Sequence, residues 1–566
     1  MVKKPCLIKE TGLFSCFNLT FVLNLKMKNN FLKFVLFVFA FINYIQAQSS
    51  FIFPLKDKPA LNGNYGEVRP NHFHAGIDFR THFSDHLPIY AVADGYVSRI
   101  KISTSGYGKV LYVTHPNGLV SVYGHEYAFA DKIKKYTEAA QEIAEVFEIE
   151  LYPKPIDLPV KQGEVIGYTG NTGSSEGPHL HFEIRDEKSE APLNPLRFLN
   201  IEDVIMPKIQ RVALYSEYQL EKIILPTKKT DTLKTTYPVG FGIECFDYEQ
   251  KQGNKNNIYK AEIYIDGKLY YSHVLDSITF DLARYVNTYA DYEAKKQKHI
   301  TIQKLFKEKN NDLPIYKTIN DKGFISFKDN VFHIVRIVAY DFYNQKDEVS
   351  FCVKTSTVST INARDSKKQD CLTEFKESTA DYSIELPAKS LYEDAQLITS
   401  YQNNILSFTA AGYDVPFQNN CLLKLKVPNN LLKYKDKLCL SNVSGVKNYV
   451  DAVFENGYAK ANIKTFGKYK VDADTIAPQI KFNSNKTGVY KTGNIVSFKV
   501  TDNYSGIGVF KLRLNGKWHL AEYEHKTNTI FFMIDEKITK GNAILNLQVS
   551  DKKNNQTNFQ TTLVIQ

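Results

Sequence analysis

Residues 179–184 alternate polar with apolar side chains, and this short pattern constrains the fold around it more than any other feature of the chain. The polar positions are His179, His181 and Glu183, and the apolar positions are Leu180, Phe182 and Ile184. Side chains of a β-strand point alternately to its two faces, so the pattern predicts a strand with both imidazoles on one face. Two hydrogen-bonded surface histidines are the ordinary alternative. The glycine-rich segment 170–173 just before the pair favours a functional site, in which the two rings serve one metal ion.

A second candidate group, His74 and Asp78, lies far earlier in the chain. A spacing of four would bring both side chains to one face of a helix, but Gly76 lies between them and Pro70 precedes them. We therefore expect a turn that enters a strand, where Gly76 allows the backbone to fold so that both side chains converge. Two histidines and one carboxylate make a tetrahedral zinc site with one open position, which is typical of catalytic zinc. The sequence therefore predicts one Zn²⁺ ion.

Such a site suits the hydrolysis of an amide bond. Zinc lowers the pKa of a bound water to about 7 and polarises a carbonyl group. A nearby unligated imidazole can take a proton from the water and pass it to the leaving amine, and a second can hydrogen-bond the oxyanion. His125 and His179 are available for these roles. We expect His72 to lie beside the site without binding the ion, and His115 to have a structural role.

Residues 50–200 resemble the lysostaphin-like (LytM-type) zinc endopeptidases. The resemblance rests on ordered motifs at 74–78, 93–95, 106–108, 123–125, 163–173 and 177–183. It implies that zinc is bound by His74, Asp78 and His181. It also implies that His125 and His179 are the catalytic pair, and that the metal lies in a narrow groove of a compact antiparallel β domain. Some members of the family have lost the ligands and only activate amidases, whereas this chain keeps all five polar groups.

The same region departs from the family in small ways. Ser121 and Glu176 stand where threonine is common, and a helical insertion at 131–150 is longer than in compact members. Within the insertion, a helical spacing relates Ile133, Tyr136, Ala140, Ile143 and Phe147, after the candidate N-cap Asp131. The pattern predicts a helix whose apolar stripe is buried against the sheet. A role in walling the substrate groove is a second hypothesis.

The length of 566 residues is too great for one core and predicts several domains. We expect a leader at 1–47, a zinc endopeptidase domain at 48–205, a β-sandwich at 206–355, a β-rich domain at 356–470 and an Ig-like β-sandwich at 471–566. Alternating runs separated by turns such as Asp266-Gly267 and Asn515-Gly516 support the later modules. The expected fold class is mainly β: a compact antiparallel β metallopeptidase domain with a helical insertion, followed by β-sandwich (Ig-like) modules.

The leader has the features of a secretory signal. Lys28 and Lys33 precede the apolar run 34–42, Ala47 offers a small residue for cleavage, and Met27 is an alternative start. The run is short for a membrane span, so we expect an exported protein of the periplasm, cell envelope or extracellular space, with no stable membrane span after signal cleavage. An uncleaved anchor is the alternative.

Net charge gives little support for a nucleic-acid partner. Six lysines and one glutamate in residues 1–47 supply half of the net charge of +10, and no basic stripe with interleaved aromatic residues follows. We therefore expect no nucleic acid as a partner. Five cysteines follow the leader, none in a close pair, so a thiolate metal site is not expected either.

Together these features predict a zinc metalloendopeptidase that hydrolyses peptide cross-links of bacterial peptidoglycan. The substrate would be a peptidoglycan peptide, and the β modules would meet partners in the cell envelope. One alternative is a non-enzymatic cell-wall-binding or amidase-activating protein of the same fold. The others are a protease for glycine-rich protein substrates, and an adhesin in which the β modules matter most.

Overall fold

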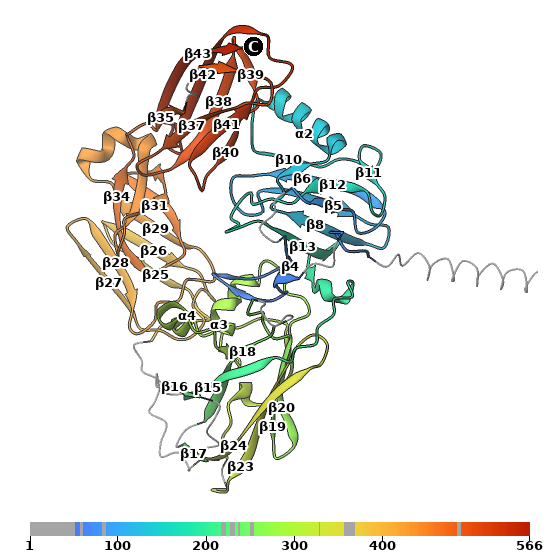
Figure 1. Cartoon of the computed structure of the whole chain (residues 1–566). Coiled ribbons are helices and arrows are strands. Elements are labelled where there is room, and N and C mark those ends of the chain that lie inside the picture. The colour runs from blue at the N-terminus through green and yellow to red at the C-terminus, as the bar shows by residue number, and fades with distance from the viewer. Residues whose placement is uncertain are drawn as a thin grey trace, which may run out of the picture. The chain divides into compact units, whose positions relative to one another are not determined.

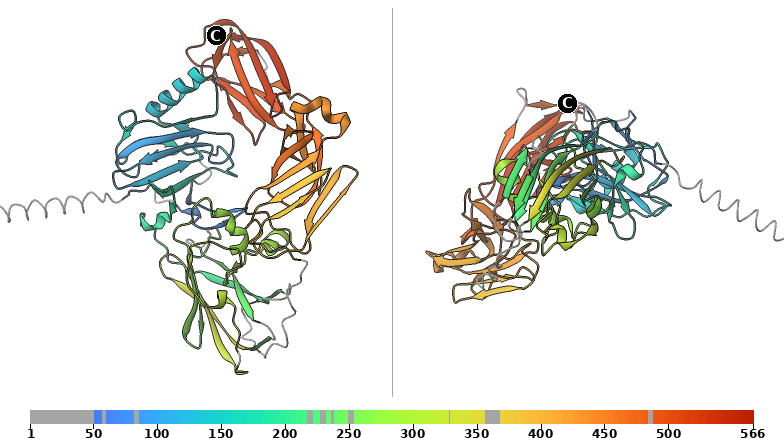
Figure 2. Two further views of the ribbon diagram at one scale, coloured as in Figure 1. Left: turned by 180° about the vertical axis from the view of Figure 1, so that it is seen from behind. Right: turned by 90° about the horizontal axis from the view of Figure 1, so that it is seen from below.

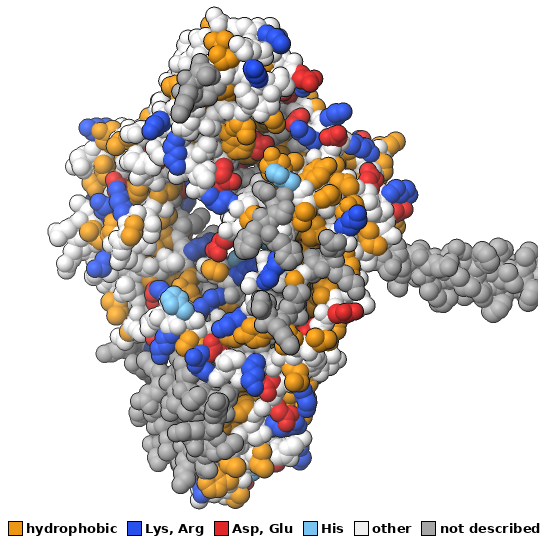
Figure 3. Space-filling view, viewed as in Figure 1, with side chains coloured by type: hydrophobic (Ala, Val, Ile, Leu, Met, Phe, Trp, Pro, Cys, Tyr) orange, Lys and Arg blue, Asp and Glu red, His pale blue; other side chains and the backbone are white. Residues whose placement is uncertain are grey.

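A computed structural model of the chain describes residues 51–56, 60–81, 86–216, 222–226, 232–235, 238–248, 254–327, 329–355, 368–483 and 488–566 (Figure 1). The predicted leader at 1–47 lies outside the described residues. Within these ranges, no helix combines the length and the apolar character that a membrane crossing requires. On the face shown in Figure 3, Lys and Arg side chains are interspersed with Asp and Glu instead of gathering in one stripe.

The first part of the described chain is built on an antiparallel sheet. Its strands run in the order β1-β4-β13-β8-β7-β6-β10, with β11 paired to β6 and β14 paired to β13. Their bounds are β1 (Leu61–Gly63), β4 (Ile77–Arg80), β6 (Gly95–Ile102), β7 (Lys109–Thr114), β8 (Leu119–Gly124), β10 (Ile149–Leu151), β11 (Pro159–Val160), β13 (His179–Asp186) and β14 (Pro192–Leu193). A smaller sheet, in the order β5-β12-β9, consists of β5 (Pro88–Tyr90), β12 (Val165–Tyr168) and β9 (Ala128–Phe129). A separate hairpin pairs β2 (Val68–Arg69) with β3 (His72–Phe73).

The predicted histidine strand is confirmed as β13, which lies between β4 and β8. Its apolar residues Leu180, Phe182 and Ile184 are fully buried. The ring of Phe182 packs against the rings of Phe79 on β4 and Tyr123 on β8, with centroids 6.0 and 5.4 Å away. Burial of this face fixes the orientation of the strand, so the other face is left for His179 and His181.

The predicted helix is α2 (Asp131–Ala144), but the prediction of its cap and of its buried face was wrong. The N-cap residue is Ala130, without a side-chain cap hydrogen bond, so Asp131 is the first helical residue. The buried residues are Ile133, Thr137 and Gln141, whereas Tyr136 is exposed and Ile143 is 87% exposed. Polar side chains occupy the buried face because each has a partner there: Thr137 donates to the Ile133 carbonyl, and Gln141 donates to the Phe147 carbonyl.

The next part packs one sheet on another around a shared apolar core, as Figures 1 and 2 show. One sheet has the order β16-β15-β18-β21, and its strands are β15 (Lys208–Ser216), β16 (Lys222–Pro226), β18 (Val239–Phe246) and β21 (Gln303–Lys304). The other has the order β17-β24-β23-β19-β20-β22, and its strands are β17 (Thr232–Thr235), β19 (Lys260–Ile265), β20 (Lys268–Val274), β22 (Tyr316–Ile319), β23 (His333–Tyr340) and β24 (Lys346–Thr355). Two short helices lie between strands: α3 (Val286–Tyr289) and α4 (Tyr292–Lys298).

A further pair of sheets encloses its own core. The order β25-β26-β29-β33-β32 joins β25 (Phe375–Ser378), β26 (Tyr382–Leu386), β29 (Cys421–Lys426), β32 (Val453–Glu455) and β33 (Tyr458–Ile463). The order β27-β28-β34-β30-β31 joins β27 (Leu397–Gln402), β28 (Ile405–Ala410), β30 (Leu438–Asn442), β31 (Asn448–Asp451) and β34 (Gly467–Ala473).

The last pair of sheets reaches the C-terminal residues and surrounds a separate core. The order β35-β37-β41-β40 joins β35 (Gln479–Asn483), β37 (Ile495–Thr501), β40 (Glu522–Glu524) and β41 (Thr529–Met533). The order β36-β43-β42-β38-β39 joins β36 (Val489–Tyr490), β38 (Ile507–Leu514), β39 (Lys517–His519), β42 (Gly541–Asp551) and β43 (Gln556–Ile565). The mainly β fold class is therefore confirmed, while the predicted boundaries and the Ig-like character of the last module stay predictions.

Replacing Phe182 with alanine should lower the free energy of unfolding by about 3–5 kcal/mol, because the lost ring leaves a cavity between Phe79 and Tyr123. Urea unfolding followed by circular dichroism measures the change. Ile143→Ala, at a position that is 87% exposed, is the control and should change the free energy by less than about 0.5 kcal/mol. Equal effects of the two substitutions would contradict the packing described for β13.

Candidate metal centre and active site

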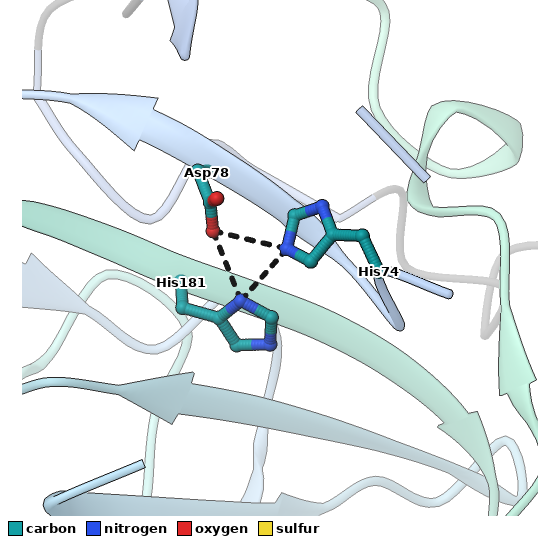
Figure 4. Close-up of side chains that lie close together, drawn as sticks. All are labelled: His74, Asp78 and His181. Carbon is teal, nitrogen blue, oxygen red and sulfur yellow. Dashed lines mark hydrogen bonds and ion pairs between the residues drawn. The ribbon is translucent and has the colours of Figure 1, made fainter. Parts of the chain in front are cut away.

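Three donor atoms, from His74, Asp78 and His181, surround one point (Figure 4). His181 Nδ1 lies 2.9 Å from Asp78 Oδ1 and 3.0 Å from His74 Nε2. The remaining pair, His74 Nε2 and Asp78 Oδ1, is 3.1 Å apart. Ligand atoms of a tetrahedral zinc ion lie about 3.3 Å from one another, since each is about 2.0 Å from the metal. The three buried side chains therefore fit one divalent metal ion.

Strand pairing explains why residues so far apart in the chain meet. Asp78 on β4 lies directly opposite His181 on β13, and His74 lies in the turn between β3 and β4. The turn predicted from the sequence is therefore confirmed. A Cβ atom on Gly76 would lie 2.2 Å from the Phe182 carbonyl oxygen, so this turn requires glycine. The requirement comes from the close approach of two backbones and not from the conformational freedom that we expected.

Hydrogen bonds fix which nitrogen of each ligating ring faces the metal position. His74 Nδ1 lies 2.8 Å from the Asn64 carbonyl oxygen. A carbonyl oxygen only accepts, so Nδ1 carries the proton and Nε2 keeps its lone pair for a metal. His181 Nε2 lies 2.7 Å from Glu183 Oε1, which leaves Nδ1 directed at Asp78. Both rings are thus held in the tautomer that a metal ligand needs.

The carboxylate of Glu183 anchors this arrangement from behind. Arg185 Nε donates to Glu183 Oε2 over 2.6 Å, and the Tyr107 hydroxyl donates to Glu183 Oε1. Burial raises the pKa of Glu183, but the charges and hydrogen bonds of Arg185 and His181 outweigh burial and lower the pKa to about 2. Glu183 is therefore an anion at neutral pH, which makes His181 a stronger electron donor.

Asp78 is held as an anion in a similar way. Its Oδ2 accepts a hydrogen bond from Arg69, which also pairs with Glu67. Burial raises the pKa of Asp78, but the charge of His74 and hydrogen bonds from the neighbouring histidines hold the pKa well below its usual range. The donor set therefore presents one negative charge and two neutral nitrogen donors.

His125 and His179 lie side by side next to the donor set, with ring centroids 4.8 Å apart. The Nδ1 atom of each faces a backbone carbonyl: that of His125 is 2.8 Å from Thr172 O, and that of His179 is 2.9 Å from Gly177 O. Nδ1 is therefore protonated in both rings and Nε2 is left to react. His179 Nε2 lies 3.5 Å from Asp78 Oδ1 and has no hydrogen-bond partner among the described residues.

The environment of His125 sets its protonation. Burial and the nearby charges of His179 and His181 lower its pKa to about 3. The ring is therefore neutral at neutral pH and able to accept a proton. Its backbone adopts φ of 63°, which is uncommon for a residue other than glycine and is found at functional sites.

The structure brings together all five residues predicted from the sequence. His72, exposed, contacts the Pro70 carbonyl, and His115 bridges the Asp94 carbonyl and Ser121 within the buried interior. Sequence reasoning missed Arg69 and Arg185, which neutralise Asp78 and Glu183. Arg185 follows the histidine pair at strand spacing and could have been found from the alternation, but no local signal marks Arg69.

Comparison with known proteins adds to this geometry. Residues 72–152 and 157–195 match peptidase family M23, and residues 370–474 match the Zu5-like domain. Over 123 residues the chain is 32% identical to the DD-carboxypeptidase/endopeptidase Mpg of Neisseria meningitidis serogroup B, a match that covers 22% of each chain. Over 119 residues it is 33% identical to an uncharacterized metalloprotease of Haemophilus influenzae, covering 21% of this chain and 19% of that protein.

Among solved structures, the catalytic domain of lysostaphin from Staphylococcus simulans is 22% identical, with a TM-score of 0.19. That match covers 25% of this chain and 91% of the lysostaphin domain. The chain spans about a fifth of the length of the curated relatives it matches.

The family match falls on the sheet that carries the donor set, and it makes this part of the chain a metallopeptidase domain. More specifically, through residues 72–195 the chain belongs with the lysostaphin-like peptidases of family M23.

Glu183→Gln should weaken metal binding by about tenfold to a hundredfold, because the partner of His181 loses its charge while keeping its shape. Titration against a chromogenic chelator measures the dissociation constant. Glu187→Gln, an exposed position just beyond the same strand, is the matched control and should bind metal as the wild type does. Unchanged affinity in Glu183→Gln would show that the contact with His181 does not support the site.

Proposed function

We propose that this protein is an exported zinc endopeptidase that cuts peptide cross-links of bacterial peptidoglycan. The observation that carries the proposal is the convergence of His74, Asp78 and His181 within 3.1 Å of one another, beside two histidines with protonated Nδ1 atoms. The relative named DD-carboxypeptidase/endopeptidase supports the choice of substrate. Its match covers only the peptidase region, so the assignment concerns that region.

In this proposal, His74 Nε2, Asp78 Oδ1 and His181 Nδ1 hold one Zn²⁺ ion. The ion supplies a Lewis acid that polarises the scissile carbonyl. His125 is neutral and takes a proton from the attacking water, because its low pKa leaves Nε2 unprotonated. His179 Nε2, beside Asp78, hydrogen-bonds the oxygen that gains charge in the transition state.

The alternative of a non-enzymatic activator rests on the loss of ligands in such family members. This chain retains all three donors and both accompanying histidines, each held by a hydrogen bond from or to a neighbouring group. The retained set favours catalysis over a purely binding role.

Two substitutions separate metal binding from proton transfer. His181→Ala should abolish both bound zinc and the release of muropeptides from sacculi, because one of three ligands is lost. His179→Ala should keep about one zinc per chain and lower kcat by about 10²–10⁴-fold. Elemental analysis gives the zinc content, and mass spectrometry of released muropeptides gives the activity and the bond that is cut.

His525→Ala, on the last module, is the control substitution and should retain zinc and activity. A His181→Ala protein that digests sacculi at the wild-type rate would exclude the proposed site. A wild type that binds zinc but releases no muropeptide would favour the activator.

Metal removal tests the cofactor directly. Dialysis against 1,10-phenanthroline should abolish hydrolysis, and one equivalent of Zn²⁺ should restore it, because the donor set matches zinc in number and type. Full activity in the chelated protein, with zinc absent by elemental analysis, would contradict a metal-dependent mechanism.

A further inference from the structure

Three aspartates that the peptidase site does not use meet near the ends of two strands. Asp247 directly follows β18, Asp341 directly follows β23, and Asp203 comes from the segment that leads into β15 (strand labels in Figure 1). One carboxylate oxygen of each lies within 4.8 Å of those of the other two. Asp247 and Asp341 are buried, at 3% and 1% exposure, and Asp203 is half-buried.

Nothing in the described part of the chain neutralises these carboxylates. Each accepts a hydrogen bond from a backbone amide nearby: Asp203 from Ile205, Asp247 from Tyr248, and Asp341 from Gln345. Burial and the mutual repulsion of the three groups raise the pKa of Asp247 to about 8 and that of Asp341 to about 6. Buried charges of one sign are costly unless an opposite charge is present.

A second observation points to a missing partner. Asp341 Oδ2 is buried and has no hydrogen-bond partner among the described residues. The same holds for Asn256 Oδ1, on a residue that is 1% exposed. Asn256 and Asp247 exchange both backbone hydrogen bonds, at 3.0 and 2.9 Å, so their side chains leave the pair on the same face. Buried polar oxygens are nearly always satisfied, so these call for a ligand that accepts lone pairs.

Another acidic cluster in the chain shows the contrast. Asp370 and Asp394, grouped with Cys371, both accept hydrogen bonds from Lys309 Nζ at 2.8 Å. That cluster has its counter-charge within the protein. The cluster of Asp203, Asp247 and Asp341 contacts no lysine or arginine of the described residues, so its counter-charge has to be an external ion.

We propose that Asp203, Asp247 and Asp341 bind a Ca²⁺ ion, separate from the peptidase metal, with Asn256 as a candidate fourth protein ligand. The donor set consists of oxygens alone, which suits a hard cation, and Ca²⁺ accepts six to eight oxygen ligands in flexible geometry. The peptidase site, with two imidazoles, favours zinc instead. A small cavity lined by Asp203, Asp247, Tyr65 and Tyr259 leads to the cluster and gives room for water ligands.

The ion would fix the segment that follows the peptidase domain. Asp203 lies in that segment, and its backbone carbonyl already accepts a hydrogen bond from the Gln345 side chain at 3.0 Å. Asp247 and Asp341 belong to the neighbouring β-sandwich. Calcium would therefore tie the connection to two strand ends and stiffen it.

Calcium binding to the zinc-loaded full chain is measured by calorimetry and by thermal unfolding. Wild type should bind Ca²⁺, and at about 100 times the dissociation constant the Tm of the sandwich should rise by about 5 °C. Asp247→Asn and Asp341→Asn should each lose one equivalent of bound Ca²⁺ and the rise in Tm. Asp329→Asn, an exposed carboxylate of the same module, is the matched control and should behave as wild type.

The sign of the effect without calcium distinguishes a ligand from a merely structural aspartate. In metal-free buffer, Asp341→Asn should have a Tm equal to or above that of wild type, because one of three repelling charges is removed. In calcium it should have the lower Tm. A variant that is less stable than wild type to the same extent in both conditions would overturn the proposal.

Terbium luminescence gives a second measurement at a temperature well below unfolding. Tb³⁺ occupies calcium sites, and excitation of Tyr65 or Tyr259 at the cavity should sensitise its emission. Asp203→Asn, at the least buried of the three positions, should abolish the emission that Ca²⁺ displaces. Wild type that shows neither calcium binding at millimolar concentration nor displaceable emission would overturn the site, and an equal response to Mg²⁺ would overturn its assignment to calcium.

Discussion

The pairing of β4 with β13 is the constraint on which the rest of the peptidase domain depends. It places Asp78 opposite His181 and brings the turn with His74 over the same point. Burial of Leu180, Phe182 and Ile184 holds the register, because a slip of one residue would turn both histidines into the core. The backbone approach at Gly76 closes the remaining gap. The chemistry of the site is therefore a consequence of how the sheet buries its apolar face.

Buried charge is handled in two different ways in this chain. At the peptidase site, arginines supply the counter-charge: Arg185 neutralises Glu183, and Arg69 neutralises Asp78. These pairs orient the ligands and keep them in the required protonation state before any metal arrives. The three aspartates at the ends of β18 and β23 lack such a partner among the described residues. The same physical cost therefore explains one set of contacts and points to a ligand in the other.

Much of the site was predictable because its signals are local. Alternation identified the strand of His179 and His181, and the glycine between His74 and Asp78 identified a turn. The buried face of α2 was not predictable from apolar spacing, since Thr137 and Gln141 are buried through hydrogen bonds to carbonyls that sequence does not reveal. Arg69 and the aspartate cluster escaped for a related reason. Each depends on strands that meet only in the folded chain, and a single Asp after a strand is an ordinary turn residue.

X-ray absorption at the zinc edge of the purified protein tests the central claim most directly, because it reports the atoms around the metal. The account predicts a shell of about four nitrogen and oxygen neighbours at about 2.0–2.1 Å, with the multiple scattering of two imidazole rings. His74→Ala or His181→Ala should remove that signal. A sulfur shell at about 2.3 Å, or an absorption spectrum unchanged by both substitutions, would show that the metal lies elsewhere.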